Sequence, residues 1–576
     1  MRIFATAGHV DHGKSSLVTA LTGTNPDRWR EERERGMTID LGFAHFTLPS
    51  GREVSLIDVP GHIRFINNML AGVGGIHGAI LVVDAHEGWM PQTEEHLRIL
   101  ELAGTRHGVV VVSRVDLVDD DEAELTAIDI ADHVVGTFLA EAPIVKVSTV
   151  RGDGLDDLRH ELDLMMDATA ASPDRGRPRL FVDRVFAPKG SGTVVTGTLT
   201  DGSLAVGDNV VVQPLQREVR IRGIQTHGRS VDSIEPGHRV ALNLSGIEHS
   251  EVRRGHAVVR ADDWHLATAI DASFTALVSL DHDVTRRGAY TMHVGSDELP
   301  VRLRVLADES IRPGARGFVR LHLAEPRPLV MGDHFVIRES GRDETVGGGV
   351  VRDVAPVLTA SRAEPHDDDD ANVDRIVAER GWIDAVELRR FTGVSRPPTV
   401  AHWVVDPAVL KASQTSLLNR VTNAGPEGLD IGVLDERDRA LLATFTEITV
   451  TSGYARTRGA DDPLLSHPGI ELIRAGGCAP TVPSTLTNSE LRRLQKAGVL
   501  FERDGEWFHV DALETARLAA AEMLTSHPDG FTMSQFREAL GVTRKHAVPI
   551  ATELDARGIT RRRGDVRIAG PRLNRE

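Results

Sequence analysis

The sequence of 576 residues contains a single cysteine, Cys478, and this scarcity excludes two kinds of site. One thiol forms no internal disulfide, and it cannot build a metal site from several cysteines. Long apolar runs are also lacking, since none approaches the roughly 18 residues of a membrane-spanning helix. The first residues lack the apolar region of a secretory signal. We therefore expect a cytoplasmic protein that does not enter membranes.

The sequence also lacks a surplus of positive charge, because its net charge is −18. This balance argues against indiscriminate binding of nucleic acid by the whole surface. The last 36 residues differ, with nine Arg and Lys against four Asp and Glu. A basic end on an acidic chain points to a local polyanion-binding surface there.

Short apolar runs alternate with helical stretches over residues 1–172. Such runs are typical of strands in a mostly parallel sheet that is buried on both faces. Each run ends in a small polar or glycine-bearing segment, where open α/β sheets bind ligands. We predict an α/β domain with strands at Ile3–Ala7, Val54–Ile57, Ala79–Val83, Gly108–Val112 and Ile144–Val147.

The composition changes after residue 172 to short alternating segments rich in Val, Thr and Gly. This pattern predicts two antiparallel β-barrels, which we place at residues 173–262 and 263–363. The acidic run His366–Asp370 predicts a solvated linker, because it lacks the spaced ligands of a calcium loop. In residues 364–576, helices precede short hairpins with Asp-Gly or Gly-Asp turns, which predicts tandem α+β winged-helix domains.

The most specific motif is a phosphate-binding loop. Gly8–Ser15 fits G-x-x-x-x-G-K-[ST] between a predicted strand and a predicted helix. Lys14 supplies positive charge to the β- and γ-phosphates, and Ser15 offers a hydroxyl to Mg²⁺. We assign nucleotide binding to Asp11, His12, Gly13, Lys14, Ser15 and Ser16.

Two further segments complete a predicted site for Mg²⁺ and the γ-phosphate. Asp58 ends a predicted strand and can hold Mg²⁺, and Thr38 can add a second hydroxyl to that of Ser15. Gly61 can donate its N–H to the γ-phosphate, which makes this segment sensitive to hydrolysis. The charged run Asp27–Arg35 is too polar for a core and predicts a mobile loop.

Recognition of the base is predicted from Ser113, Arg114 and Asp116, which follow another strand. A carboxylate at Asp116 can accept hydrogen bonds from two guanine donors that adenine does not offer. Arg114 can stack on the base, and Ser148 can close over the guanine O6. Taken alone, Ser148 is equally well explained as the end of a strand.

Gly8–Ser15, Thr38, Asp58–His62, Asp116 and Ser148 together resemble, in order, the five nucleotide-binding motifs of translational GTPases. Within that class the chain resembles the SelB family of selenocysteine-specific elongation factors more than elongation factor Tu. The segments that carry this resemblance are Ala5–Ser15, Arg35–Gly42, Asn68–Ile76, Asp183–Phe186 and Lys189–Thr198.

The resemblance implies a monomer that delivers selenocysteinyl-tRNA to the ribosome at recoded UGA codons and is tethered to a selenoprotein mRNA hairpin. GTP would be hydrolysed to GDP on the ribosome, with His62 positioning water beside Val10 and Met37. The family's guanine motif usually has Asn or Thr and then Lys, where this chain has Ser113 and Arg114.

An aminoacyl pocket is implied by the resemblance at Asp183, Arg184 and Arg239. A selenol is more acidic than a thiol, whose pKa is near 8.5, so the pocket needs positive charge to recognise its anion. Without the resemblance, a structural ion pair at the barrel edge is the favoured explanation of these residues.

The basic tail is predicted to bind RNA through a recognition helix at Lys545–Arg557 and a wing at Arg561–Arg567. Pro549 is tolerated only in the first turn of such a helix, which limits where the helix begins. The alternative is that the arginines only keep a small domain soluble. The predicted RNA contacts are Arg544, Lys545, Arg561, Arg562, Arg563 and Arg567.

Two other functions remain open at this stage. A GTPase subunit of a small-molecule enzyme, such as an ATP sulfurylase, would share the first three domains but would not need a basic winged-helix tail. A GTPase-switched regulator could use winged helices to bind DNA, because fold alone does not separate DNA from RNA binding.

Overall fold

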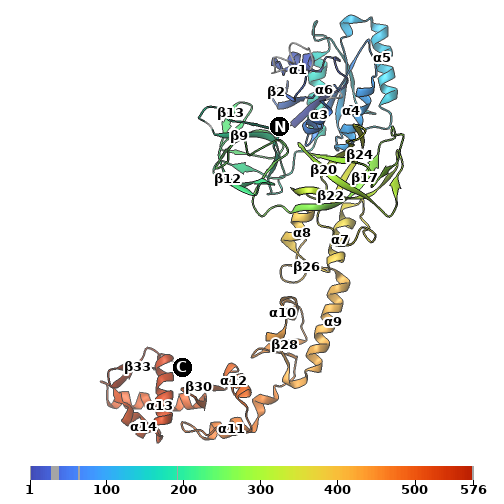
Figure 1. Cartoon of the computed structure of the whole chain (residues 1–576). Coiled ribbons are helices and arrows are strands. Elements are labelled where there is room, and N and C mark those ends of the chain that lie inside the picture. The colour runs from blue at the N-terminus through green and yellow to red at the C-terminus, as the bar shows by residue number, and fades with distance from the viewer. Residues whose placement is uncertain (1, 27–37, 63–64, 191, 574–576) are drawn as a thin grey trace. The chain divides into compact units, whose positions relative to one another are not determined.

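The computed structural model describes residues 2–26, 38–62, 65–190 and 192–573. The chain divides into two compact units, Met1–Pro398 and Thr399–Glu576, and Figure 1 gives the order of their elements. The predicted mobile loop Asp27–Arg35 and Met37 lie outside the described residues. Across the described ranges, no helix is long and apolar enough to cross a membrane.

The first unit begins with a six-stranded sheet of order β2-β3-β1-β4-β5-β6. All five predicted strands are present and parallel, so their carboxyl ends meet at one edge of the sheet. The strands are β1 (Arg2–Ala7), β3 (Glu53–Asp58), β4 (Gly78–Asp84), β5 (Gly108–Ser113) and β6 (Ile144–Val147), with β2 (Gly42–Thr47) at the edge.

Two cores lie on the two faces of this sheet, because successive side chains of a strand point to opposite faces. Along β1, Ile3, Ala5 and Ala7 belong to one core and Phe4 belongs to the other. The edge strand β2 is antiparallel and alternates buried with less buried residues, so it lacks the continuous apolar run of its neighbours. The helices are α1 (Lys14–Thr22), α3 (Ile66–Val73), α4 (Pro91–Leu102), α5 (Asp120–His133) and α6 (Leu155–Ala168).

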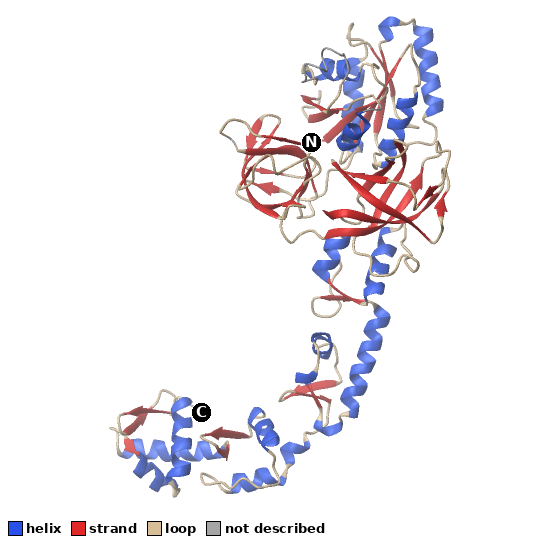
Figure 2. Cartoon of the chain, viewed as in Figure 1, coloured by secondary structure: helices blue, strands red, loops and turns tan. Residues whose placement is uncertain are grey.

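The two predicted antiparallel barrels follow in the first unit, and Figure 2 shows them built almost entirely of strands. Barrel 1 has Leu180, Val195, Val210 and Leu242 among its core residues. Its strands are β7 (Arg179–Phe181), β8 (Arg184–Phe186), β9 (Thr193–Thr200), β10 (Leu204–Ala205), β11 (Asn209–Gln213), β12 (Arg217–Thr226), β13 (Arg229–Val231), β14 (Ser233–Ile234), β15 (Arg239–Ser245) and β16 (Ala257–Val259).

Barrel 2 closes with the order β17-β22-β20-β19-β23-β24. Closure brings β24 so near β17 that a side chain at Gly349 would collide with the carbonyl oxygen of Ser273. Its strands are β17 (Leu266–Ala276), β18 (Val284–Thr285), β19 (Tyr290–Val294), β20 (Asp297–Leu306), β21 (Ser310–Ile311), β22 (Arg316–Pro328), β23 (His334–Glu339) and β24 (Glu344–Asp353).

The acidic run after barrel 2 is exposed to solvent, as its composition predicted, but it begins a helix instead of forming a linker. Asp368 caps α7 (Asp369–Arg380) by accepting a hydrogen bond of 2.8 Å from the N–H of Ala371. Arg352 of β24 pairs with Asp369 at 2.7 Å. Acidic residues stabilise the first turn of a helix, so the run starts a folded element that continues into β25 (Trp382–Asp384) and α8 (Ala385–Thr392).

The second unit combines helices with short antiparallel hairpins (Figure 2). As predicted, a hairpin follows both α12 and α15. Pro549 is the sixth residue of α15, so its predicted confinement to the first turn is wrong. The elements are β26 (Trp403–Val405), α9 (Pro407–Asn423), β27 (Leu429–Asp430), α10 (Glu436–Leu442), β28 (Ile448–Thr451), β29 (Tyr454–Thr457), α11 (Pro468–Ala475), α12 (Asn488–Lys496), β30 (Leu500–Arg503), β31 (Glu506–His509), α13 (Asp511–Ser526), β32 (Phe531–Thr532), α14 (Met533–Leu540), α15 (Arg544–Ala556), β33 (Thr560–Arg563) and β34 (Val566–Ala569).

Candidate functional site

The loop between β1 and α1 has the backbone conformation of a phosphate cradle. Gly8 has φ 130° and a side chain there would collide with the carbonyl oxygen of Val82, so only glycine fits. Gly13, at φ 86°, precedes the first residue of α1, whose N-terminus favours anions. Burial lowers the pKa of Lys14 to about 8, although Asp58 and Asp11 oppose the shift. A bound phosphate would favour the charged ammonium further.

Three oxygen-bearing side chains meet beside this loop. The Ser15 hydroxyl lies 2.7 Å from Oδ2 of Asp58 and 2.7 Å from Oγ1 of Thr38. Thr6 donates a hydrogen bond of 2.7 Å to Oδ1 of Asp58 and orients that carboxylate. Hydroxyl and carboxylate oxygens are the ligands that Mg²⁺ prefers, so the residues predicted to hold Mg²⁺ are brought together and suit the ion.

The segment after Asp58 touches the phosphate loop. A side chain at Gly61 would come within 2.7 Å of the backbone nitrogen of Val10, so this close approach requires glycine. His62 follows directly, and its ring lies 5.9 Å from the ring of Phe65. The structure therefore places Gly61 against the loop that contains Lys14 and puts His62 next to it.

The predicted base-recognition residues lie at the carboxyl ends of β5 and β6. Ser148 donates a hydrogen bond of 2.6 Å to Asp116, which lowers the pKa of that carboxyl. Ser113 donates a hydrogen bond of 2.7 Å to the carbonyl oxygen of His12, so it ties β5 to the phosphate loop. Arg114 has φ 57° and pairs with Asp84 at 3.0 Å.

The side chain of His12 is fully buried and points into the protein. Its Nδ1 accepts a hydrogen bond of 3.1 Å from the N–H of Asp84, and its Nε2 lies 3.2 Å from Glu87. Burial lowers the pKa of His12 to about 4, so the ring is neutral. A nucleotide contact by His12 is therefore limited to its backbone.

Four residues of this site were missed by the motif analysis. Gln92 accepts from the N–H of Val10 at 3.1 Å, and His96 accepts from that of Gly8 at 3.1 Å, so α4 supports the loop from behind. Thr6 and Asp84 are the other two. Asp84 ends β4 at the same edge as Asp58, and that position could have revealed it.

The predicted aminoacyl residues lie together in barrel 1 and face the nucleotide-binding domain. Arg239 forms a two-pronged ion pair with Asp183, and one prong is 2.9 Å long. Thr196 adds a hydrogen bond of 2.6 Å to Asp183. Burial alone would raise the pKa of Asp183, but Arg239 and these hydrogen bonds keep it below its ordinary value.

One segment of the nucleotide-binding domain covers these arginines. Arg184 lies 3.3 Å from the carboxylate of Asp40 and donates to the carbonyl oxygen of Leu41. The ring of Phe43 lies 3.3 Å from the guanidinium carbon of Arg239 and 4.6 Å from that of Arg184. The contacts of Asp40 and Phe43 with barrel 1 had no signal in the sequence, because their partners lie more than a hundred residues away.

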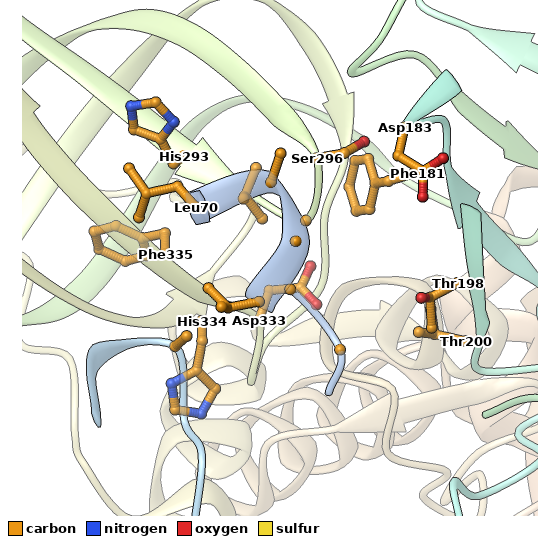
Figure 3. Close-up of a pocket in the computed structure, with 18 of the residues that line it drawn as sticks. Leu70, Phe181, Asp183, Thr198, Thr200, His293, Ser296, Asp333, His334 and Phe335 are labelled. Atoms are coloured by element: carbon orange, nitrogen blue, oxygen red, sulfur yellow. The ribbon is translucent and has the colours of Figure 1, made fainter. Parts of the chain in front are cut away.

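A cavity of about 250 Å³ lies where the α/β domain and the two barrels meet (Figure 3). Asp183 and Phe181 contribute from barrel 1, His293 and Phe335 from barrel 2, and Leu70 from α3. The described residues that line this cavity include neither Arg184 nor Arg239. The arginines instead meet the segment Asp40–Phe43.

The predicted RNA-binding residues divide into exposed and buried groups. Arg561, Arg562 and Arg563 are exposed on β33, and Arg544 and Lys545 are exposed at the start of α15. Lys545 also pairs with Glu506 at 2.7 Å. Arg567 is only 8% exposed and pairs with Asp555 at 2.9 Å, so its predicted place on the basic surface is wrong.

Another group in the described part of barrel 2 has ligand types suited to a metal ion, namely His282, Glu339 and Glu344. His282 lies 2.8 Å from Glu344, and this hydrogen bond raises the pKa of His282. Arg342 lies 3.9 Å from each glutamate. These ion pairs account for the cluster without a metal.

Family models match three parts of the chain. The elongation factor Tu GTP binding domain matches residues 1–168 and the elongation factor Tu domain 2 matches residues 192–259. The elongation factor SelB winged helix matches residues 522–569, which contain α14, α15 and the last hairpin.

Relatives and solved structures extend the similarity to the whole chain. A selenocysteine-specific elongation factor from Desulfomicrobium baculatum is 30% identical and aligns with 98% of this chain and 99% of that protein. The crystal structure of a bacterial selenocysteine-specific elongation factor, EF-Sec, matches with a TM-score of 0.73 and 26% identity over 99% of both chains. SelB from Methanococcus maripaludis in complex with the GTP analogue GppNHp matches with a TM-score of 0.54 and 25% identity, over 62% of this chain and 80% of that one.

Proposed function

The chain belongs to the family of selenocysteine-specific elongation factors, and from this premise we propose that it delivers selenocysteinyl-tRNA to the ribosome in a GTP-dependent cycle. Membership makes it a GTPase that uses GTP, GDP and Mg²⁺. The observation that carries the proposal is the connection of the two sites. The phosphate loop and the aminoacyl arginines are joined by one short segment that begins at Thr38.

We assign guanine recognition to Asp116, whose carboxylate is held ionised by Ser148. Lys14 and the N-terminus of α1 neutralise phosphate charge, and Ser15, Thr38 and Asp58 would hold Mg²⁺. When bound there, Mg²⁺ would neutralise negative charge on the phosphates. His62 would orient the attacking water, since it follows Gly61 at the point where the γ-phosphate is sensed.

We assign recognition of the amino acid to Arg184 and Arg239. A selenolate is an anion, so it gains charge-assisted hydrogen bonds from a guanidinium that a neutral serine hydroxyl does not match. Asp183 holds Arg239 in place through two contacts. The arrangement therefore favours the charged side chain over serine.

We assign binding of the selenoprotein mRNA hairpin to the last winged helix. The exposed cations at Arg544, Lys545, Arg561, Arg562 and Arg563 can contact phosphates, while unpaired loop bases carry sequence information. Phosphate contacts of this kind would tether the factor to a message without engaging the nucleotide site.

The proposal is tested by protection of the aminoacyl ester from hydrolysis. The protein with GTP and Mg²⁺ should protect selenocysteinyl-tRNA, and it should protect seryl-tRNA much less. Protection should be weak with GDP, and ATP should not replace GTP. Equal protection of both tRNAs would contradict the proposed specificity.

A further inference from the structure

The short segment from Thr38 to Phe43 touches both functional sites at once. At one end, the hydroxyl of Thr38 lies 2.7 Å from that of Ser15. Two residues later, the Asp40 carboxylate lies 3.3 Å from Arg184 and 3.6 Å from Arg254, both of barrel 1. Because only Ile39 separates the two residues, the position of Thr38 restricts the position of Asp40.

Helix α3, which follows Asp58–His62, also connects the Thr38–Phe43 segment to barrel 1. Asn68 of α3 donates a hydrogen bond of 2.7 Å to the carbonyl oxygen of Ile39. Its side-chain oxygen accepts a hydrogen bond of 2.5 Å from Arg254. The segment that begins at Thr38 and the helix that follows Asp58–His62 therefore both contact barrel 1 at Arg254.

The charges around the pocket remain favourable for an anion. Three arginines, Arg184, Arg239 and Arg254, face two aspartates, Asp40 and Asp183. Among these five described residues, the three positive charges outnumber the two negative ones. Asp40 therefore does not cancel the attraction for an anion, and it restricts the Arg184 guanidinium through the carboxylate and the neighbouring Leu41 carbonyl.

We propose that Asp40 is a positioning residue that makes the aminoacyl pocket depend on the bound nucleotide, by orienting Arg184 while Thr38 is held at the Mg²⁺ site. The inference rests on the proposed function. Ordering a long side chain before binding raises affinity, because the ligand no longer has to restrict it. When hydrolysis releases Thr38, Asp40 leaves Arg184 as well, and the pocket loses its oriented guanidinium. The two sites are thereby coupled in both directions.

A matched control separates this coupling from simple adhesion between domains. Glu53 on β3 also links the α/β domain to barrel 1, through Arg229 at 3.1 Å and His227 at 3.4 Å. It does not belong to the segment that carries Thr38. A general weakening of the domain contact would therefore affect Glu53→Gln and Asp40→Asn alike.

The test measures protection of selenocysteinyl-tRNA and seryl-tRNA by full-length variants, with GTP and with GDP. For Asp40→Asn, the affinity for selenocysteinyl-tRNA with GTP should fall on the order of five- to tenfold. The affinity with GDP, that for seryl-tRNA, and GTP binding to the free protein should stay within about twofold by the same coupling argument. Glu53→Gln should keep the wild-type ratio between GTP and GDP.

A double-mutant cycle with Arg184→Gln sharpens the test. If Asp40 acts through Arg184, its substitution should have little further effect once Arg184 is replaced. An Asp40→Asn protein that keeps the wild-type ratio of GTP to GDP affinities, or that loses affinity equally for both nucleotides and both tRNAs, would overturn the inference. Failure of the wild-type protein to prefer selenocysteinyl-tRNA would instead overturn the proposed function.

Discussion

The nucleotide site and the terminal winged helix reach their functional surfaces in opposite ways. The nucleotide site gathers side chains from several strand ends into one corner, where Ser15, Thr38 and Asp58 lie within hydrogen-bond distance. The winged helix displays Arg561, Arg562 and Arg563 in a row on an exposed strand. The first surface depends on a few exact geometries, whereas the second depends on summed charge. Single substitutions should therefore act strongly in the first and weakly in the second.

The largest effect is expected at His62, because the proposed function assigns it the orientation of the attacking water. His62→Ala should reduce ribosome-stimulated GTP hydrolysis by about 100-fold or more, the range of a lost water-positioning group. Binding of GTP should change little. Single-turnover hydrolysis with purified ribosomes gives the answer, and an unchanged rate would assign His62 a structural role.

Base recognition comes next. Asp116→Asn should reduce GTP affinity by about 100-fold, because two charge-assisted hydrogen bonds to guanine are lost. Xanthine nucleotides should be favoured, since their ring presents an acceptor to the new amide. Competition titrations with GTP, XTP and ATP measure this shift, and a parallel loss of all three would point to misfolding instead.

The aminoacyl pocket should show an intermediate effect. Removing one guanidinium with Arg239→Gln should lower selenocysteinyl-tRNA affinity about tenfold, while seryl-tRNA changes less. Asp183→Asn can be compared with Arg239→Gln, because it keeps the Arg239 guanidinium but removes its ion-pair partner. Equal losses for both tRNAs would indicate a general contact with the acceptor stem.

In the winged helix, substitutions of exposed and of buried arginines should have different effects. Replacing Arg561, Arg562 and Arg563 together with Ala should lower hairpin affinity about tenfold and flatten its salt dependence. Arg567→Ala should instead lower the melting temperature, since Arg567 is buried against Asp555. Filter binding over a salt series and thermal denaturation distinguish the two, and a salt slope that stays unchanged in the triple variant would remove these residues from the RNA surface.

The smallest effect is expected at Ser148, whose hydroxyl donates a hydrogen bond to Asp116. Ser148→Ala removes the hydrogen bond to Asp116 and the one accepted from the N–H of Arg151, and it should lower GTP affinity about three- to fivefold. The loss should be constant between pH 6 and 8. The hydrogen bond from Ser148 holds the pKa of Asp116 below its ordinary value, and without it the carboxylate is still ionised in that range. A loss that grows toward pH 6 would contradict this explanation, because it would mean that the Asp116 carboxylate becomes protonated in that range.

Contiguous motifs made the nucleotide site predictable. Lys14, Ser15 and Asp58 hold their expected places because strand, turn and helix determine them locally. The orientation of the His12 side chain was not predictable, because the motif determines only its backbone. The contact between Asp40 and Arg254 was not predictable for another reason, because a single sequence does not indicate which residues 214 positions apart come together.

Composition alone was a weaker guide than position. The acidic run at Asp368 looked like a linker, but its placement before a helix makes it a cap. Arg567 looked exposed because arginine usually is, yet it lies on the middle strand of a three-stranded sheet and has Asp555 as a buried partner. Both errors come from assigning an environment to a residue type before its neighbours are known.

The most direct test of the whole account requires both regions in one reaction. A reconstituted translation system would contain the full chain, GTP, selenocysteinyl-tRNA and a message with an internal UGA codon followed by the cognate hairpin. We predict full-length product with selenocysteine at the UGA position. This product should be lost when the hairpin is deleted, or when the triple arginine variant is used at higher salt. Equal read-through without the hairpin, or with seryl-tRNA in place of selenocysteinyl-tRNA, would contradict this prediction.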